Sequence, residues 1–542
     1  MRVTNNMILR NSSYNINGTK SSVNTSMNQM TTQKKIDKPS DDPVVAIRSL
    51  RLSTSLSRVD QYYKKNIPDA ESWLEVSETA LNNMKSLMTD VRTQCVNGST
   101  DTLNQEDRNT ILKQLKSLQS QLYAEGNADY AGRTVFTGYR TDQNLVFTEN
   151  ETKTAYEINQ NFSYEDLESF RYYTGDVKVP STKDEVLNND ISDTSQTNYY
   201  RLRTSYDKLD DMSAFTYTTK DANGNEQKVS FALDQATEQT GTNPDGSNFS
   251  YKTANAVDAA GNAVAPASNM YIFDTEEDWA SAMEEKTVGE NDIVLIKENG
   301  NIVLGEKISS ELRTGKAAIS TTYTKTGFDQ GQLKPEYYFN CTNITDPNHT
   351  IQYKKFDENG KEIGYDINYT IANNQELTVN TEASDAFNSD IQRDIDDMIT
   401  AVTRAINAHD KITELKSMKG EAQYADKEYQ EKLDDWIAAA QKEADYADDH
   451  LQKLFSSEIG NVDGYLNQIN LSITQVGCTV DQLKLTETRM SNQQETLQEL
   501  QSENDNLDIS EIIINYTAMY NAYQSSLTAA GKLSGMTLLN YL

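Results

Sequence analysis

Cysteine, histidine and proline are scarce in this chain. Its 542 residues include three cysteines, three histidines and eight prolines. The cysteines, Cys95, Cys341 and Cys478, are odd in number and widely spaced, so they indicate neither a disulfide framework nor a zinc site. Cys95 and Cys478 lie in stretches of helical pattern, where small buried thiols are expected.

The histidines do not form a ligand set either. His349 lies in a polar segment and His409 and His450 lie on charged helical segments, so no pair has metal-binding spacing, and the HExxH motif is absent. The segment 221–225 begins like a calcium loop, but Glu226 stands where an EF-hand requires glycine. The sequence therefore predicts no catalytic residue, no cofactor-binding or metal site, and no enzyme activity.

Paired acidic residues are the remaining candidates for acid–base chemistry. The pairs are Asp41–Asp42, Asp434–Asp435 and Asp448–Asp449. No apolar sequence surrounds them, as a proton-transfer site would require. We therefore interpret them as helix caps and solvated helix faces.

Long apolar runs and positive charge are also lacking. No run approaches the roughly 20 residues of a membrane-spanning helix, and the N-terminal segment has neither the apolar core nor the cleavage site of a signal peptide. With 82 acidic against 50 basic residues, the net charge is −32. Nucleic acid would require a basic face, so we expect no nucleic-acid partner. The lack of a long apolar run predicts no membrane insertion. The chain is cytosolic or leaves by a route that cleaves no signal.

What the chain does have is an apolar seam at each end. Apolar or small residues recur at steps of three and four over 52–95 and again over 509–530. The same rhythm returns over 469–497, with Glu487 and Gln494 at two of its positions. Such steps place a narrow stripe on one helix face, which is buried only against another helix. Hydrophobic residues make up 36% of the chain, which suits helical rods with thin seams. The two ends are therefore predicted to pack together as a coiled-coil rod.

Local signals predict where these helices begin and bend. In the Pro39–Pro43 turn, Asp42 is expected to cap a helix whose first residue is Pro43. Pro68 follows a repeated four-residue step, so a kink is expected there. A second helix is predicted over 104–124, and a break at Gly460–Gly464.

The central segment 141–383 has a different character. It is rich in Tyr, Thr, Asn and Asp and contains stretches of period-two alternation typical of strands. Asn299–Gly300 between two apolar runs predicts a hairpin, and three Asp/Gly turns are expected at 221–225, 258–262 and 357–361. A short strand or hairpin arm is also expected over 133–139.

These patterns predict an α+β fold that is mainly α, with long N- and C-terminal helices and a central, mainly β insert. Residues 1–42 and 505–542 would form a terminal helical domain that is disordered before assembly, because isolated thin helices are marginal in water. Residues 43–140 and 384–504 would form a helical rod domain. Residues 141–383 would form a surface-exposed insert.

Several stretches resemble the bacterial flagellin superfamily, and within it the proteins at the junction between hook and filament. They are MRVTNNM at the start, KIDKPSDDPVVA, GRTVFTGYRT, QVGCTVDQLKLTETRM and the closing DISEIIINYTAMYNAYQSSLTAAGKLSGMTLLNYL. The resemblance covers both ends, about half of the chain. The most discriminating marks are Pro39-Ser40-Asp41-Asp42-Pro43, where filament flagellins usually carry Asp-Asp-Ala-Ala-Gly, and Thr537-Leu538-Leu539.

The resemblance implies a structural adaptor of the bacterial flagellum that joins the hook, through hook-associated protein 1, to the flagellin filament. It implies self-association in a ring, export through the type III channel without a cleaved signal peptide, and an extracellular place at the hook–filament junction. It also implies that a cytosolic export chaperone binds the C-terminal helix. Two alternatives are a filament flagellin, and a glycan-binding or enzymatic insert on a flagellin scaffold.

Overall fold

The computed structural model describes residues 5–100, 103–220, 226–243, 247–264, 267–283, 286–315, 318–358 and 360–535. The chain divides into two compact units. The first contains residues 1–72, 368–378 and 479–542, and the second contains 73–367 and 379–478. Long terminal helices together with a central sheet confirm the α+β, mainly α prediction.

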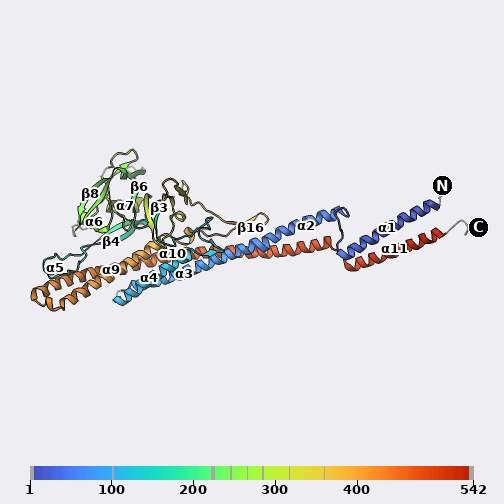
Figure 1. Ribbon diagram of the computed structural model, residues 1–542. Coiled ribbons are helices and arrows are strands. Elements are labelled where there is room, and N and C mark those ends of the chain that lie inside the picture. Colours follow the sequence, from blue (N-terminus) through green and yellow to red (C-terminus); the bar gives the residue numbers. More distant parts are fainter. Residues whose placement is uncertain are drawn as a thin grey trace, which may run out of the picture. The chain divides into compact units, whose positions relative to one another are not determined.

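The first unit is built from paired helices. Its complete helices are α1 (Asn5–Thr32), α2 (Pro43–Gln61) and α11 (Ile509–Gly535). Figure 1 shows α1 lying along α11. The unit also holds the start of α3 (Ile67–Gly98), the last part of α10 (Lys427–Asp505) and the hairpin of β16 (Asn368–Ala372) and β17 (Gln375–Thr378).

The beginning of α2 follows its predicted cap. The carboxylate of Asp42 accepts hydrogen bonds from the backbone N–H groups of Val44 and Val45, at 2.9 and 3.2 Å. Pro43 occupies the first helical position, where its missing N–H costs nothing. The prediction for this turn is confirmed.

The predicted irregularity near Pro68 is a π-helical segment, η1, over Tyr62–Asn66. There the N–H of Ile67 donates to the carbonyl of Tyr62, five residues back instead of four. Pro68 has no N–H to offer the carbonyl of Lys64, and the wider turn lies where the apolar step of four residues repeats. One extra residue per turn keeps the apolar stripe on the same face.

The second unit combines helices with the β insert. Its helices include most of α3 and α10, together with α4 (Gln105–Gly126), α9 (Asp390–Lys419) and the short α5 (Lys183–Asn188), α6 (Glu276–Ala282), α7 (Glu306–Gly315) and α8 (Ala383–Ala386). Asn104 caps α4 in a reciprocal box with Asp107, as expected for a helix that starts there.

The seams predicted on α3 and α10 are buried. Leu81, Met88 and Val91 on α3, and Ile469 and Val476 on α10, are at most 3% exposed. Burial of these stripes supplies most of the stability of such helices, since propensity alone is weak.

Two predictions about α10 are wrong. The helix runs through Gly460 and Gly464 without a break. Both glycines face open space, and the neighbouring Val462 is buried, so packing outweighs the roughly 1 kcal/mol that each glycine costs. Cys478 is exposed, whereas Cys95 and Cys341 are buried. Cys478 lies two residues after the buried seam residue Val476, and residues two apart do not share a helix face, so its side chain lies off the seam.

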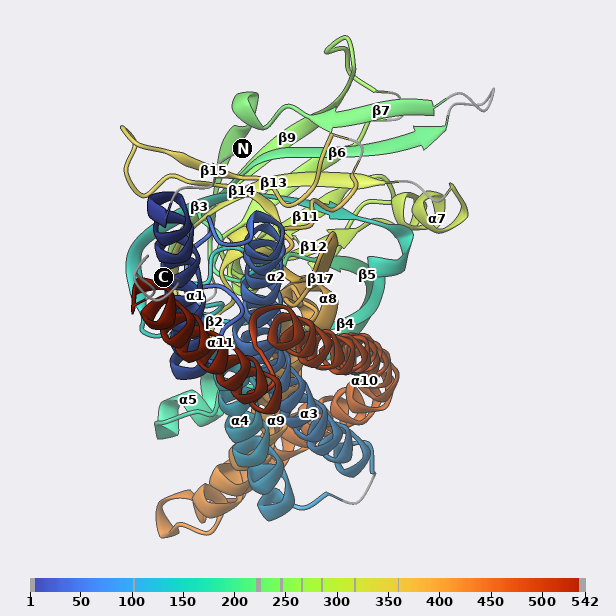
Figure 2. The same ribbon diagram turned by 90° about the vertical axis from the view of Figure 1, so that its right-hand side faces the viewer.

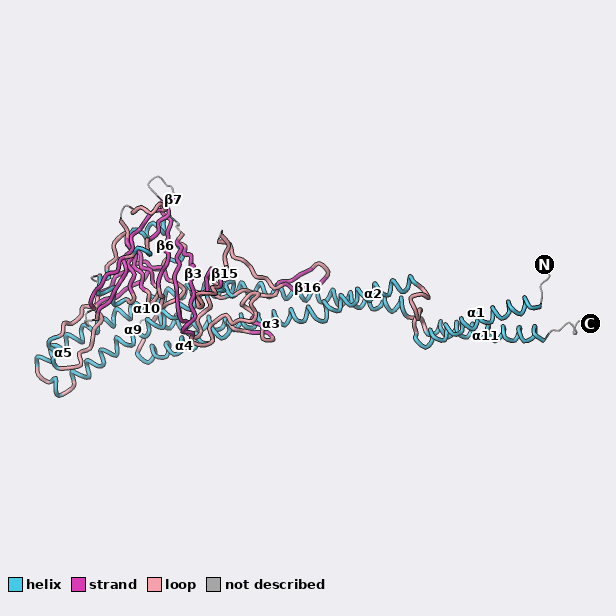
Figure 3. Tube along the Cα trace, turned by 45° about the horizontal axis from the view of Figure 1, so that its top comes forward, coloured by secondary structure: helices cyan, strands magenta, loops and turns pink. Residues whose placement is uncertain are grey.

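The insert forms one large, mostly antiparallel sheet (Figures 2 and 3). Its main path runs β15-β14-β3-β13-β6-β7-β9-β10-β11-β12-β5-β4, and β8 pairs with β9. The strands are β3 (Glu151–Phe162), β4 (Glu168–Thr174), β5 (Ser195–Arg203), β6 (Asp211–Lys220), β7 (Glu226–Phe231), β8 (Thr237–Thr242), β9 (Asn248–Asp258), β10 (Asn269–Phe273), β11 (Ile293–Ile296), β12 (Asn301–Leu304), β13 (Ile319–Phe328), β14 (Asn340–Asn343) and β15 (Ile351–Tyr353).

The turns of the insert agree with the sequence where the structure describes them. β11 and β12 form the predicted hairpin, with Gly300 at a φ of +64°. In the turns that begin at Asp258 and Asp357, each carboxylate accepts from the backbone N–H four residues on, at 2.9 and 2.8 Å. The turn at 221–225 lies outside the described residues. Of the arm expected over 133–139, only 133–134 is a strand: β2 (Arg133–Thr134) pairs with β1 (Asp129–Tyr130) in a small hairpin, and 135–139 forms bends and a turn.

Candidate functional site

The first candidate site is an apolar surface on the terminal helices. Of the large apolar side chains of α11 that the structure describes, Ile512 alone is buried, at 3% exposure. The more exposed ones on α11 are Ile509, Ile513, Ile514, Met519, Tyr520 and Leu527, and on α1 they are Met7, Ile8, Leu9, Tyr14, Met27 and Met30. We call these twelve side chains the terminal apolar surface. Clustered apolar exposure of this kind marks a surface that binds a partner.

The sequence predicted this surface only in part. Of the predicted seam, Ile512 is buried and Tyr516 is half-buried, whereas Ile509, Met519 and Leu527 are exposed. Ile513 and Ile514 lie beside the seam and were not predicted as surface residues. The signal for them is the run of three consecutive isoleucines, which covers a wider arc than one helix can bury against one partner.

A joint ties the end of α1 to the end of α10 within the first unit. The backbone N–H of Lys35 donates to the carbonyl of Asp505 at 2.8 Å, and that of Leu507 donates to the carbonyl of Gln33 at 3.1 Å. The Lys34 ammonium donates to the Asn506 side chain at 2.7 Å. These bonds join residues 33–35 to residues 505–507, which lie more than 400 positions apart in the sequence.

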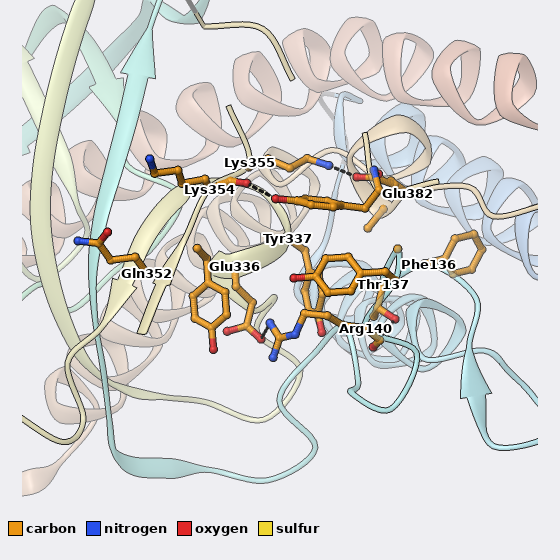
Figure 4. A pocket seen from close by; sticks show the side chains of 14 residues that line it. Phe136, Thr137, Arg140, Glu336, Tyr337, Gln352, Lys354, Lys355 and Glu382 are labelled. Carbon is orange, nitrogen blue, oxygen red and sulfur yellow. Dashed lines mark hydrogen bonds and ion pairs between the residues drawn. The ribbon is translucent and has the colours of Figure 1, made fainter. Parts of the chain in front are cut away.

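The second candidate site is a pocket of about 290 Å³ in the second unit (Figure 4). Its lining comes from five separate stretches of the chain. The lining residues are Phe136, Thr137, Gly138, Tyr139, Arg140, Glu336, Tyr337, Gln352, Tyr353, Lys354, Lys355, Tyr365, Glu382 and Ala383. Four tyrosines and several charged side chains therefore face one space.

Ion pairs organise the charges of this pocket. The Arg140 guanidinium contacts the Glu336 carboxylate at 2.6 Å and lies over the rings of Tyr337 and Tyr353, 5.6 and 4.8 Å from their centroids. Lys355 is buried and pairs with Glu382. Although burial disfavours its charge, hydrogen bonds with Glu362 and Glu382 raise the pKa of Lys355. Each buried charge therefore has an opposite partner.

The polar candidates from the sequence are not brought together. His349 contacts Asp346 at 3.2 Å, His409 contacts Asp448 at 2.8 Å, and His450 packs against the Phe170 ring. No group of three or more His, Cys, Asp or Glu side chains that could hold a metal ion occurs in the described part of the chain.

Members of the three acidic pairs act as a helix cap or form ion pairs with basic side chains. Asp42 caps α2, Asp434 pairs with Lys419, and Asp448 contacts Arg108 at 2.8 Å. Among the helices that the structure describes, none combines the length and apolarity needed to cross a membrane.

Comparison with known proteins shows which chains share these features. Residues 3–141 match the bacterial flagellin N-terminal helical region. Over 126 residues the chain is 29% identical to flagellar hook-associated protein 3 of Escherichia coli strain K12, which is 23% of this chain and 39% of that protein. It is also 29% identical over 115 residues to flagellar hook-associated protein 3 of Salmonella typhimurium, 21% of this chain and 36% of that one. The chain thus matches well under half the length of these relatives.

Two solved structures are similar to this chain at low identity and low TM-score. Flagellar hook associated protein-3 from Legionella pneumophila is 10% identical with a TM-score of 0.28, covering 83% of this chain and 97% of that one. FlgL from Xanthomonas campestris is 9% identical with a TM-score of 0.28, covering 84% and 99%. The matched N-terminal region and the curated relatives confirm the predicted resemblance to flagellar hook-associated proteins, and they support a structural component of the flagellum.

Proposed function

We propose that this chain is the adaptor that joins the flagellar hook to the flagellin filament. In this proposal it binds hook-associated protein 1 on one side and flagellin on the other, and it associates with its own copies in a ring. The observation that carries the proposal is the terminal apolar surface on α1 and α11, of which α1 lies within the region that matches the flagellin N-terminal type.

The mechanism we propose is coupled folding and assembly. The pair of α1 and α11 leaves Ile513, Ile514 and Tyr14 exposed to water. A thin helical pair with so little burial is marginal on its own, so residues 1–42 and 505–542 are disordered before assembly. Neighbouring subunits then supply the buried area that offsets the ordering entropy.

The division of labour along the chain belongs to the same proposal. Residues 43–140 and 384–504 form the helical rod domain, and 141–383 form an insert exposed on the surface of the flagellum. The protein is exported without a cleaved signal peptide and acts outside the cell, at the hook–filament junction. A cytosolic export chaperone covers the apolar face of α11 before export, as a groove-binding partner of an amphipathic helix does. The chain carries no catalytic, cofactor or metal function.

A truncation tests the assembly mechanism. A chain that ends at Asp508 lacks the helix carrying six of the twelve residues of the terminal apolar surface. We expect it to keep the folded second unit, judged by circular dichroism and protease resistance, and to fail to join isolated hooks. Incorporation of the truncated protein at the level of the full chain would contradict the mechanism.

Immunogold electron microscopy tests the place of the protein. An antibody raised against residues 141–383 should label one band between hook and filament on flagellated cells. Label along the whole filament would instead establish the filament flagellin, and the junction role would be wrong.

A further inference from the structure

The pocket of the second unit has no role in the proposed assembly, and its chemistry is that of a ligand site. Aromatic rings and polar groups converge on a space of about 290 Å³. Sites for small molecules combine apolar or aromatic walls with a few fixed polar groups in this way. We propose that this pocket binds a neutral saccharide, one sugar unit at a time.

The aromatic walls fit the apolar face of a sugar ring. Tyr139 is 58% exposed, and its ring lies against that of Tyr365 with centroids 4.7 Å apart. Tyr353 and Tyr337 add two more rings to the lining. A pyranose presents C–H groups on its faces and hydroxyls around its edge, so its faces pack on rings while its edge reaches polar side chains.

The polar groups fit the edge of a sugar. Arg140 and Lys354 are donors, Glu382 is an acceptor, and Gln352 offers both. A vicinal pair of hydroxyls needs this mixture, since each hydroxyl donates one hydrogen bond and accepts others. Planar side chains held by ion pairs are already oriented, which reduces the entropy lost on binding.

The charge balance favours an uncharged ligand. Arg140 is neutralised by Glu336 at 2.6 Å, and Lys355 is neutralised by Glu382. Only Lys354 among the lining residues adds an exposed ammonium without an acidic partner in the lining. Lys355 also contacts Glu362 at 2.7 Å, just outside the lining, so the carboxylates around the pocket equal the cations in number. A charged ligand would therefore gain little over its hydration in water.

The backbone of the pocket depends on Gly138. Its φ is +61°, in the left-handed region that favours glycine. A Cβ at this position would lie 3.4 Å from the Cβ of Tyr365 and 3.9 Å from the Cδ of Glu382. This close approach places 136–140 against 365 and 382. Residues 141–383 alone lack Phe136–Arg140, so the complete chain is needed to form the site.

Saturation-transfer difference NMR on the full chain tests the proposal. The probes are methyl β-glucoside, methyl β-galactoside, methyl α-mannoside and N-acetylglucosamine, each titrated to obtain a Kd. We expect transfer to at least one probe, about tenfold weaker binding in Tyr139→Ala, and near-normal binding in Tyr139→Phe, which keeps the ring. Gln352→Ala should weaken binding roughly threefold through one lost hydrogen bond.

The controls separate the pocket from the rest of the surface. Tyr164→Ala removes another partly exposed tyrosine of the same unit, 37% exposed and outside the pocket lining, and should bind as the original chain does. Tyr139 is exposed, so its variants should keep the melting temperature, which is measured alongside. Absence of transfer to all four probes would overturn the proposal, and so would equal binding by Tyr139→Ala and the original chain. Neither result bears on hook incorporation.

Discussion

Arg203 on β5 forms an ion pair with Asp394 on α9, across 191 positions of sequence and between the sheet and the helices of the second unit. The same guanidinium lies 3.0 Å from Asp397 and 3.1 Å from Glu168. Burial disfavours the charged form of Asp397, but the positive charges of Arg201 and Arg203 outweigh this effect and hold the pKa of Asp397 well below its usual range. One buried cluster of charges thus fastens the β insert to the helices from which it emerges.

Loss of Arg203 should therefore destabilise the second unit strongly. Arg203→Leu leaves Asp394 and Glu168 buried or half-buried with less compensation, because the neighbouring Arg201 pairs with Glu168 and Asp397 instead of Asp394. Removal of one partner from a buried pair typically costs about 3–5 kcal/mol. The measurement is the free energy of unfolding in guanidinium, followed by tryptophan fluorescence.

An exposed pair provides the control for this variant. Lys208 contacts Asp329 at 2.8 Å with both side chains more than half exposed. Lys208→Leu should cost less than about 1 kcal/mol. Equal losses in the two variants would show that the buried cluster contributes no more than a surface pair.

Glu458 on α10 should make stability depend on pH. Burial, and then the negative charge of Asp394, raise the pKa of Glu458 to about 9 from an ordinary value of 4.5. Between these values the folded chain holds a proton that the unfolded chain has released, so the free energy of unfolding falls as pH rises from about 4.5 to about 9.

Glu458→Gln should remove this dependence, since glutamine is neutral at every pH and can still accept from Asn461, as Glu458 does at 3.2 Å. We expect the variant to be more stable by about 1–3 kcal/mol at pH 8, with the difference shrinking toward pH 4.5. The check is a series of guanidinium unfolding curves from pH 4.5 to pH 9. Glu428→Gln, at an exposed position of the same helix, should show the same pH dependence of the free energy of unfolding as the original chain. The same pH dependence in Glu458→Gln would show that Glu458 does not carry the proton.

Local structure was predictable where neighbouring residues decide it. The Asp42 cap, the Asn299–Gly300 hairpin and the buried stripe through Val91 each depend on a few residues close in sequence. The physical rules for helix caps, turns and helix periodicity concern residues at this sequence separation, so they predict such features. The break expected at Gly460 failed because long-range packing outweighed local propensity.

The order of the strands and the pocket could not be predicted, because they depend on residues that are distant in sequence. β3 pairs with both β13 and β14, strands more than 150 residues further along the chain. Such a partner is chosen by the whole sheet, and period-two alternation says only which face a side chain takes. The pocket was missed for the same reason, since Arg140, Glu336 and Glu382 are distant in sequence and are brought together only by the tertiary structure.

Two tyrosines of the second unit should respond in opposite directions to loss of the hydroxyl. The Tyr338 hydroxyl is buried and has no hydrogen-bond partner among the described residues, whereas the Tyr206 hydroxyl donates to the carbonyl of Leu333 at 2.9 Å. Tyr338→Phe should stabilise the chain by roughly 1 kcal/mol, because an unpaired buried hydroxyl costs free energy. Tyr206→Phe should destabilise it by about 1 kcal/mol. Thermal unfolding of both variants measures the difference, and shifts of the same sign would contradict it.

The terminal apolar surface makes the last prediction. Ile514 is 67% exposed on α11, so replacing it loses little packing within the chain. Ile514→Ser should therefore leave the melting temperature of the isolated protein unchanged. If a neighbouring subunit buries this side chain, the variant loses roughly 1.5–3 kcal/mol per contact, which corresponds to at least a tenfold drop in incorporation into hooks. The matched control is Ile351→Ser on β15, where the isoleucine is 53% exposed but belongs to the insert. Equal incorporation of both variants would mean that α11 does not form the contact between subunits.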